Sequence, residues 1–111
     1  MQDTFLSQSE HQKVVGARLR RVVGMLDMTY VEAAALMNVS KQTFNDWLKG
    51  NSYPNVYGVY RLQKAKGITY DFLFLGDWSG LPPKLAAEMD AELRAEMDAA
   101  LARDRVGAGN P

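Results

Sequence analysis

Two helix start signals, Thr29 and Ser40, stand only 11 residues apart in the segment 29–50, TYVEAAALMNVSKQTFNDWLKG, and this spacing strongly limits the possible folds. Thr29 offers an N-cap hydroxyl, and Glu32 three residues later completes a capping box. We therefore expect a helix from Tyr30 to Met37. Its three alanines are small enough for a second helix to cross it at close range.

The second signal predicts another short helix directly after a tight turn. Asn38 is one of the few residues besides glycine that tolerate the left-handed backbone with which a helix ends sharply. Ser40 can then cap a helix from Lys41 to Lys49, which Gly50 ends. The segment therefore predicts two short helices joined by a turn.

The predicted helix 41–49 has two different faces. Its rear face is apolar, and its other side carries polar residues: Phe44, Trp47 and Leu48 against Lys41, Gln42, Asn45 and Asp46, with Thr43 at the margin. A helix that enters the major groove of DNA must be short, held from behind and free of bulky apolar groups on its leading face. Lysine, glutamine and asparagine fit guanine or adenine edges, whereas Asp46 either accepts from a cytosine amine or is a solvated helix residue.

Helical spacing continues on both sides of this segment. Apolar residues recur every three or four positions from Gln12 to Leu26, which predicts one helix there. A further helix is expected between Pro54 and Gly67, and a short one from Tyr70 to Leu75. Because no segment shows the period-2 alternation of a strand, we expect an all-α body over residues 12–76.

The two ends of the chain differ from this body. We expect residues 1–11, with the lone histidine His11, and residues 104–111 to be disordered. Residues 77–82 predict a hinge, and residues 83–103 predict an alanine-rich amphipathic helix about 30 Å long.

An apolar stripe on the predicted helix 83–103 favours a short contact. Its members are Leu85, Met89, Leu93, Met97 and Leu101. A step of four residues overshoots one turn, so the stripe turns by about 160° round the helix, which disfavours a long coiled coil. The stripe can pack on the same helix of a second subunit, on the chain's own domain or on another protein. We prefer the homodimer, because a dimer with two-fold symmetry presents two recognition helices and so doubles the DNA readout.

Charge is divided unevenly along a chain whose net charge is zero. Residues 12–76 hold nine basic and four acidic side chains, an excess of five positive charges. Residues 77–111 hold seven acidic and four basic ones. The neutral total therefore hides a basic body and an acidic tail, and it does not argue against a nucleic-acid partner.

On these residues the chain resembles the Cro and phage-repressor type of helix-turn-helix regulator. The stretch from Gly16 to Arg20 resembles the first helix of that family, and the stretch from Gly67 to Leu73 resembles its last part. Seven residues stand where the two motif helices need them: Thr29, Ala34, Val39, Ser40, Thr43, Trp47 and Gly50. The resemblance covers residues 12–76 and implies a compact five-helix lambda-repressor-like DNA-binding domain, to which the helix 83–103 is an addition.

The resemblance also implies roles for individual residues. Lys41, Gln42 and Asp46 occupy positions that touch base edges, and Asn45 shares their face. Four further residues occupy positions that more often touch phosphates: Tyr30, Thr43, Lys49 and Asn51. The implied function is a sequence-specific DNA-binding transcriptional regulator, a repressor that binds double-stranded DNA as a homodimer.

The chain departs from the family pattern at several positions, among them Asn38, which replaces the more usual turn glycine. An arginine–glutamate ion pair that often links the first and third helices is replaced by Val23 and Leu48, and a packed apolar pair can keep that contact. Tyr30 stands where the family usually has glutamine. Gln63 and Lys66 stand where the fourth helix is usually apolar, and nothing in the sequence explains them.

The main alternative to a DNA-binding regulator is a protein that acts by binding another protein. The same fold can be a protein-interaction module, such as an antitoxin-like or accessory regulator, whose helix 83–103 binds a protein partner. The chain has no cysteine and one histidine, so we expect no catalysis, no metal and no other cofactor. We expect no secretory signal and no span of roughly 20 apolar residues, hence a cytoplasmic protein with no membrane partner.

Overall fold

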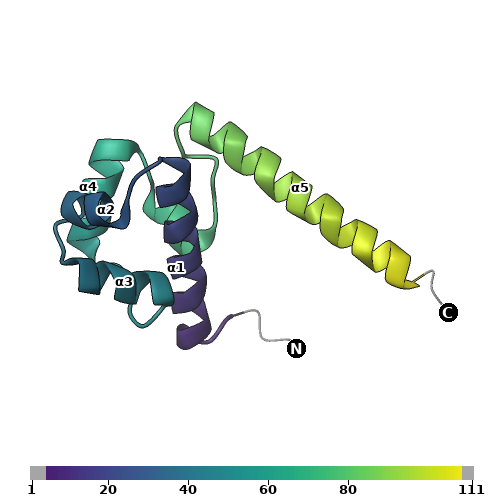
Figure 1. The fold of residues 1–111 in the computed structure, drawn as a ribbon, viewed down its shortest axis with the longest axis horizontal. Helices are drawn as coiled ribbons and strands as arrows, with labels where there is room; N and C mark the ends of the chain where they lie inside the picture. Colours follow the sequence, from purple (N-terminus) through teal and green to yellow (C-terminus); the bar gives the residue numbers. More distant parts are fainter. Residues whose placement is uncertain (1–4, 109–111) are drawn as a thin grey trace. The chain divides into compact units, whose positions relative to one another are not determined.

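Six helical elements account for the fold of the residues that the structure describes. The computed structural model describes residues 5–108 and places α1 at Gln8–Met25, α2 at Tyr30–Leu36, α3 at Lys41–Lys49, α4 at Val56–Lys66, a π-helical turn η1 at Asp71–Leu75, and α5 at Pro83–Ala108 (Figure 1). The described part of the chain is all-helical, as predicted, and holds no strand.

The start of α2 and the turn after it form as predicted. Thr29 Oγ1 accepts a hydrogen bond from the backbone nitrogen of Glu32 (3.1 Å), and the backbone nitrogen of Thr29 donates to Glu32 Oε1 (2.8 Å). α2 ends at Leu36, one residue before the predicted end. Asn38 adopts the left-handed conformation (φ 62°), which confirms its predicted place in the turn.

The unit that extends to Leu81 has one apolar core. α1 packs against α3 and η1, and α2 packs against α3 and α4. The largest fully buried side chains of this unit are Val15, Leu19, Val22, Val23, Met37, Phe44, Val59, Leu62, Ile68 and Leu73. Val23 of α1 and Leu48 of α3 are both buried, so this apolar pair lies in the core.

The two polar residues of α4 that the sequence left unexplained, Gln63 and Lys66, lie outside the core. Gln63 and Lys66 are exposed, and the buried face of α4 consists of Gly58, Val59 and Leu62 instead. These two residues therefore place no polar group in the core.

Helical structure extends further than predicted at both ends. α1 begins at Gln8, not at residue 12, because Ser7 and Glu10 form a capping box of their own. The expectation of disorder up to residue 11 is wrong for 8–11. α5 continues to Ala108, so disorder from residue 104 is also wrong as far as 108. Residues 5–7 precede α1 without helical structure, and Ser7 caps that helix. The other parts of these predictions, at 1–4 and 109–111, lie outside the described residues.

The second unit begins at Pro82, inside the predicted hinge 77–82, which carries no helix. Within α5, Arg94 Nε donates to Asp90 Oδ2 (2.8 Å), an exposed ion pair one turn apart. Met97 and Leu101 of its apolar stripe are exposed. Among the described residues, no helix is both long and apolar enough to cross a bilayer.

Candidate nucleic-acid interface

Caps at both ends fix the length of α3. Ser40 Oγ accepts from the backbone nitrogen of Thr43 (3.0 Å) and donates its proton to Thr43 Oγ1 (3.0 Å). At the other end Gly50 adopts a left-handed backbone (φ 79°). α3 therefore begins at Lys41 and ends at Lys49, as the sequence predicted.

The rear face of α3 anchors the helix in the core. Phe44, Trp47 and Leu48 are 0%, 3% and 6% exposed. At 100° per residue they cover an arc of about 100°, and α1 and α2 both pack against α3. The predicted anchoring of α3 from behind is thus confirmed.

The opposite side of α3 carries the predicted base-reading residues. Lys41 and Gln42 are exposed, and Asn45 and Asp46 are half-buried. With Lys49, which is exposed, they cover an arc of about 140° on one side of the helix. The structure therefore brings these side chains together on the side that does not enter the core. An arc of this width is suited to the floor of a major groove, which admits one α-helix.

Three of the residues predicted to touch phosphates, Thr43, Lys49 and Asn51, belong to α3 or follow it directly. Lys49 is in the last turn of α3, and Asn51 follows the cap and is exposed. The backbone nitrogen of Asn51 donates to the carbonyl oxygen of Asp46 (2.9 Å), which fixes the position of Asn51 relative to the helix. Thr43 is half-buried, and its hydroxyl can still donate a proton while it accepts one from Ser40.

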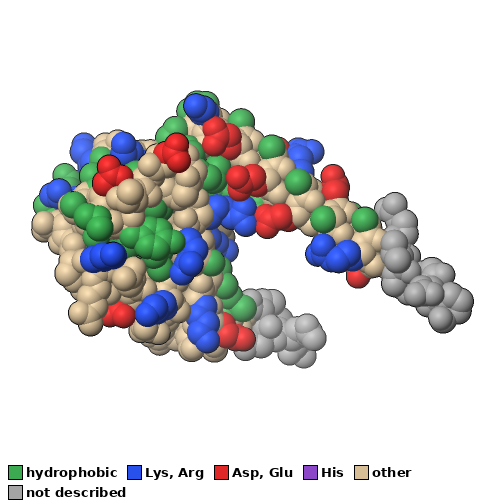
Figure 2. Space-filling model, viewed as in Figure 1, with side chains coloured by type: hydrophobic (Ala, Val, Ile, Leu, Met, Phe, Trp, Pro, Cys, Tyr) green, Lys and Arg blue, Asp and Glu red, His purple; other side chains and the backbone are tan. Residues whose placement is uncertain are grey.

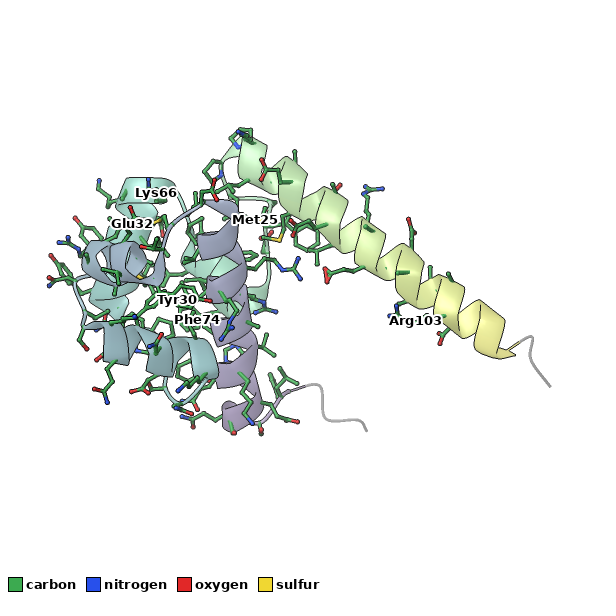
Figure 3. The ribbon with its side chains drawn as sticks, in the orientation of Figure 1. Met25, Tyr30, Glu32, Lys66, Phe74 and Arg103 are labelled. Atoms are coloured by element: carbon green, nitrogen blue, oxygen red, sulfur yellow. The ribbon has the colours of Figure 1, made fainter. Side chains whose placement is uncertain are left out.

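Tyr30 has a structural contact that the sequence did not reveal. It is the first residue of α2 (Figure 3). Its ring packs on that of Phe44 with centroids 5.8 Å apart and planes tilted by 58°. The side chain is 37% exposed, so one part of the ring belongs to the contact between α2 and α3 while another part meets solvent.

The first turns of α2 and α3 differ in charge. In α2, Glu32 occupies the first turn, and the backbone N–H of Thr29 together with nearby Lys66 lowers the pKa of its carboxyl (Figure 3). The first turn of α3 holds no acid. Because a helix N-terminus carries partial positive charge, the start of α3 is the better position for a phosphate.

Basic side chains gather on the same unit. Figure 2 shows Lys and Arg side chains around an apolar area on the visible face of the helical body. Lys13 and Arg20 of α1 and Lys41 and Lys49 of α3 are exposed. Exposed lysine and arginine side chains are the groups with which proteins neutralise phosphates.

His11 makes contacts that sequence reasoning missed, since it placed this residue in a disordered segment. His11 Nδ1 lies 2.8 Å from Tyr53 Oη, and Nε2 lies 2.8 Å from the carbonyl oxygen of Phe74. A carbonyl oxygen only accepts, so Nε2 carries a proton and donates it. The imidazole thereby joins α1 to the loop after α3 and to η1. Its partners are 42 and 63 residues away, so no local pattern could signal them.

No described residues suggest a metal centre, because no group of three or more acidic or histidine side chains is arranged to hold an ion. Comparisons of this chain with family models, with curated proteins and with solved structures found no match.

Proposed function

We propose that this chain is a sequence-specific DNA-binding protein that places α3 in the major groove and regulates transcription as a repressor. The observation that supports this most is the division of α3 into two faces. Phe44, Trp47 and Leu48 are buried, and the side with Lys41 and Gln42 is exposed. A short capped helix held in this way presents its outer side chains to a groove without backbone distortion.

The outer face of α3 supplies the readout in this proposal. Lys41 donates to guanine O6 or N7, and Gln42 and Asn45 each offer the donor and acceptor pair that matches adenine. Asp46 accepts from a cytosine amine. Lys49 and Asn51 contact phosphates and set the register of the helix on the duplex.

The proposed mechanism is occlusion by binding alone. Two copies would place their α3 helices in successive major grooves, about 34 Å apart, on a site with two-fold symmetry. Such a dimer doubles the number of base contacts, because one short helix reads only a few base pairs.

Selection of bound sequences from a random pool of duplex DNA tests this proposal. We expect one enriched motif that contains two inverted half-sites. A Gln42→Ala variant should enrich a motif that differs at one position of each half-site, because the variant loses one base contact. Recovery of unenriched sequence by the wild type would contradict sequence-specific binding.

A protein-interaction module is the second candidate, and one observation favours it. Met97 and Leu101 of α5 are 64% and 51% exposed, which leaves apolar surface for a partner. Salt dependence separates the two functions. DNA binding through several phosphate contacts should weaken by orders of magnitude between low and moderate salt. An apolar contact through α5 should change little or strengthen.

A further inference from the structure

A hollow on the surface of α4 combines aromatic rings with positive charge. It is lined by Leu36, Tyr57, Tyr60, Arg61, Lys64 and Ala65. Tyr57 and Tyr60 stack one turn apart, with centroids 5.8 Å apart and planes inclined by 25°. They are 53% and 49% exposed, so the rings contribute more to the surface than to the core. None of the residues that line this aromatic hollow belongs to the set that the proposed DNA readout uses.

Arg61 is held in a fixed position at the hollow. Its Nε donates to the carbonyl oxygen of Leu36 (2.6 Å), and Nη1 donates to Tyr57 Oη (3.4 Å). The guanidinium carbon lies 5.7 Å from the centroid of the Tyr57 ring. These contacts leave the Nη2 group able to donate to a carboxylate, and they remove much of the entropy cost of ordering the side chain. Lys64 adds a second cation, and no acidic residue lines the hollow.

A ligand for this hollow must combine apolar side chains with carboxylates. α5 of this chain has both. Between residues 96 and 104, the part that holds Met97 and Leu101, it carries three acidic side chains and one basic one. Met97 and Leu101 are exposed, and at 100° per residue Asp104 and Asp98 lie within about 100° of them on the helix surface. Methionine makes favourable contacts with aromatic rings, and the carboxylates match Arg61 and Lys64.

We infer that the aromatic hollow on α4 binds the outer part of α5 of a second copy of this chain, so that two copies exchange their α5 helices reciprocally. In this dimer Met97 and Leu101 cover the rings of Tyr57 and Tyr60. Asp98 and Asp104 lie near the two cations. The inference does not depend on DNA binding, because it concerns a different surface.

Charge reversal of each side tests the inference by analytical ultracentrifugation of the full chain. Variant A carries Lys64→Glu and Ala65→Glu in the hollow, which leaves Arg61 and its hydrogen bonds intact. Variant B carries Asp98→Lys and Asp104→Lys on α5. Like charges would then face each other in either homodimer, so we expect each variant to dimerise about ten-fold or more weakly than the wild type. A mixture of A and B should restore the dimer, because a reciprocal exchange pairs each altered surface with an oppositely charged one.

A matched control separates this effect from general charge. Gln63→Glu with Lys66→Glu makes the same change of charge on the same helix, at exposed residues that do not line the hollow. We expect this control to dimerise like the wild type. Circular dichroism of every variant checks that the fold is kept. The inference is overturned if the wild type is a monomer, if variant A dimerises like the control, or if mixing A with B restores nothing.

Discussion

Gly16 of α1 lies directly against Leu48 of α3. A Cβ at Gly16 would come within 2.7 Å of the carbonyl oxygen of Leu48, and it would also overlap the carbonyl oxygen of Trp47. The two backbones therefore approach as closely as a residue without a side chain allows. In this way α1 sets the position of α3, and with it the direction of the proposed readout face.

Gly16→Ala should destabilise the fold. The new methyl group meets backbone atoms that cannot rotate away, and such overpacking costs about 1–3 kcal/mol. Gly24→Ala in the same helix is the matched control, because a Cβ there meets nothing within 4 Å. The control should be neutral or more stable by up to about 1 kcal/mol. Urea unfolding measures both, and equal effects would mean that α1 and α3 are not in close contact.

His11→Ala should cost about 1–3 kcal/mol of unfolding free energy. The change leaves the carbonyl oxygen of Phe74 and the hydroxyl of Tyr53 without the ring nitrogens that they face. Gln12→Ala, one residue further along α1, is the control for loss of a polar side chain at a half-buried position. Chemical denaturation of the two variants compares them, and similar losses would show that the bridge of His11 contributes nothing.

The capping boxes of α1 and α2 predict a dependence of stability on pH. Backbone hydrogen bonds from Ser7 and Thr29 hold the pKa values of Glu10 and Glu32 below their ordinary value of 4.5. A carboxyl with a lower pKa in the folded state stabilises the fold above the unfolded pKa, and this contribution is lost as the pH falls through the folded pKa.

We therefore expect the unfolding free energy to fall as the pH is lowered below 4.5, and to fall less in the double variant Glu10→Gln with Glu32→Gln. Glu88→Gln on α5 should behave like the wild type, since Glu88 is not part of either capping box. Thermal unfolding across this range of pH makes the comparison. If the stability of the wild type and that of the double variant fall equally with pH, the capping carboxylates are not the cause of the pH dependence.

Salt dependence should separate the proposed phosphate contact from the proposed base contacts. Lys49→Ala removes one cation near the backbone of DNA, so the slope of log K against log salt should fall by about one, with all sequences weakened alike. Gln42→Ala should leave the slope unchanged and alter the preferred base. Fluorescence anisotropy at several salt concentrations measures both slopes, and the reverse pattern would contradict the two assignments.

Local signals were sufficient to predict the motif helices. Ser40 and Gly50 act on backbone groups within a few residues of themselves, so the limits of α3 could be placed without the fold. The apolar spacing of Phe44, Trp47 and Leu48 predicted the buried face for the same reason.

Contacts between distant segments could not be predicted. His11 joins partners on two other elements, and the packing of Tyr30 on Phe44 depends on how α2 and α3 cross. The early start of α1 does have a local signal, the capping box of Ser7 and Glu10. The sequence prediction missed this signal because the first ten residues are mostly polar and show no helical period. The limits and the buried face of α3 were thus predictable from the sequence. Its contacts with DNA are still untested predictions.

One comparison tests the central claim that the outer face of α3 reads DNA. Lys41→Ala and Lys66→Ala remove the same charge from exposed side chains of the same unit, and Figure 3 shows Lys66 well away from α3. The measurement is the affinity of each variant, by fluorescence anisotropy, for the duplex selected by the wild type. We predict a loss of about ten-fold or more for Lys41→Ala, which corresponds to one lost base contact, and a change of about two-fold or less for Lys66→Ala. Equal losses in the two variants, or no loss in Lys41→Ala, would contradict the account.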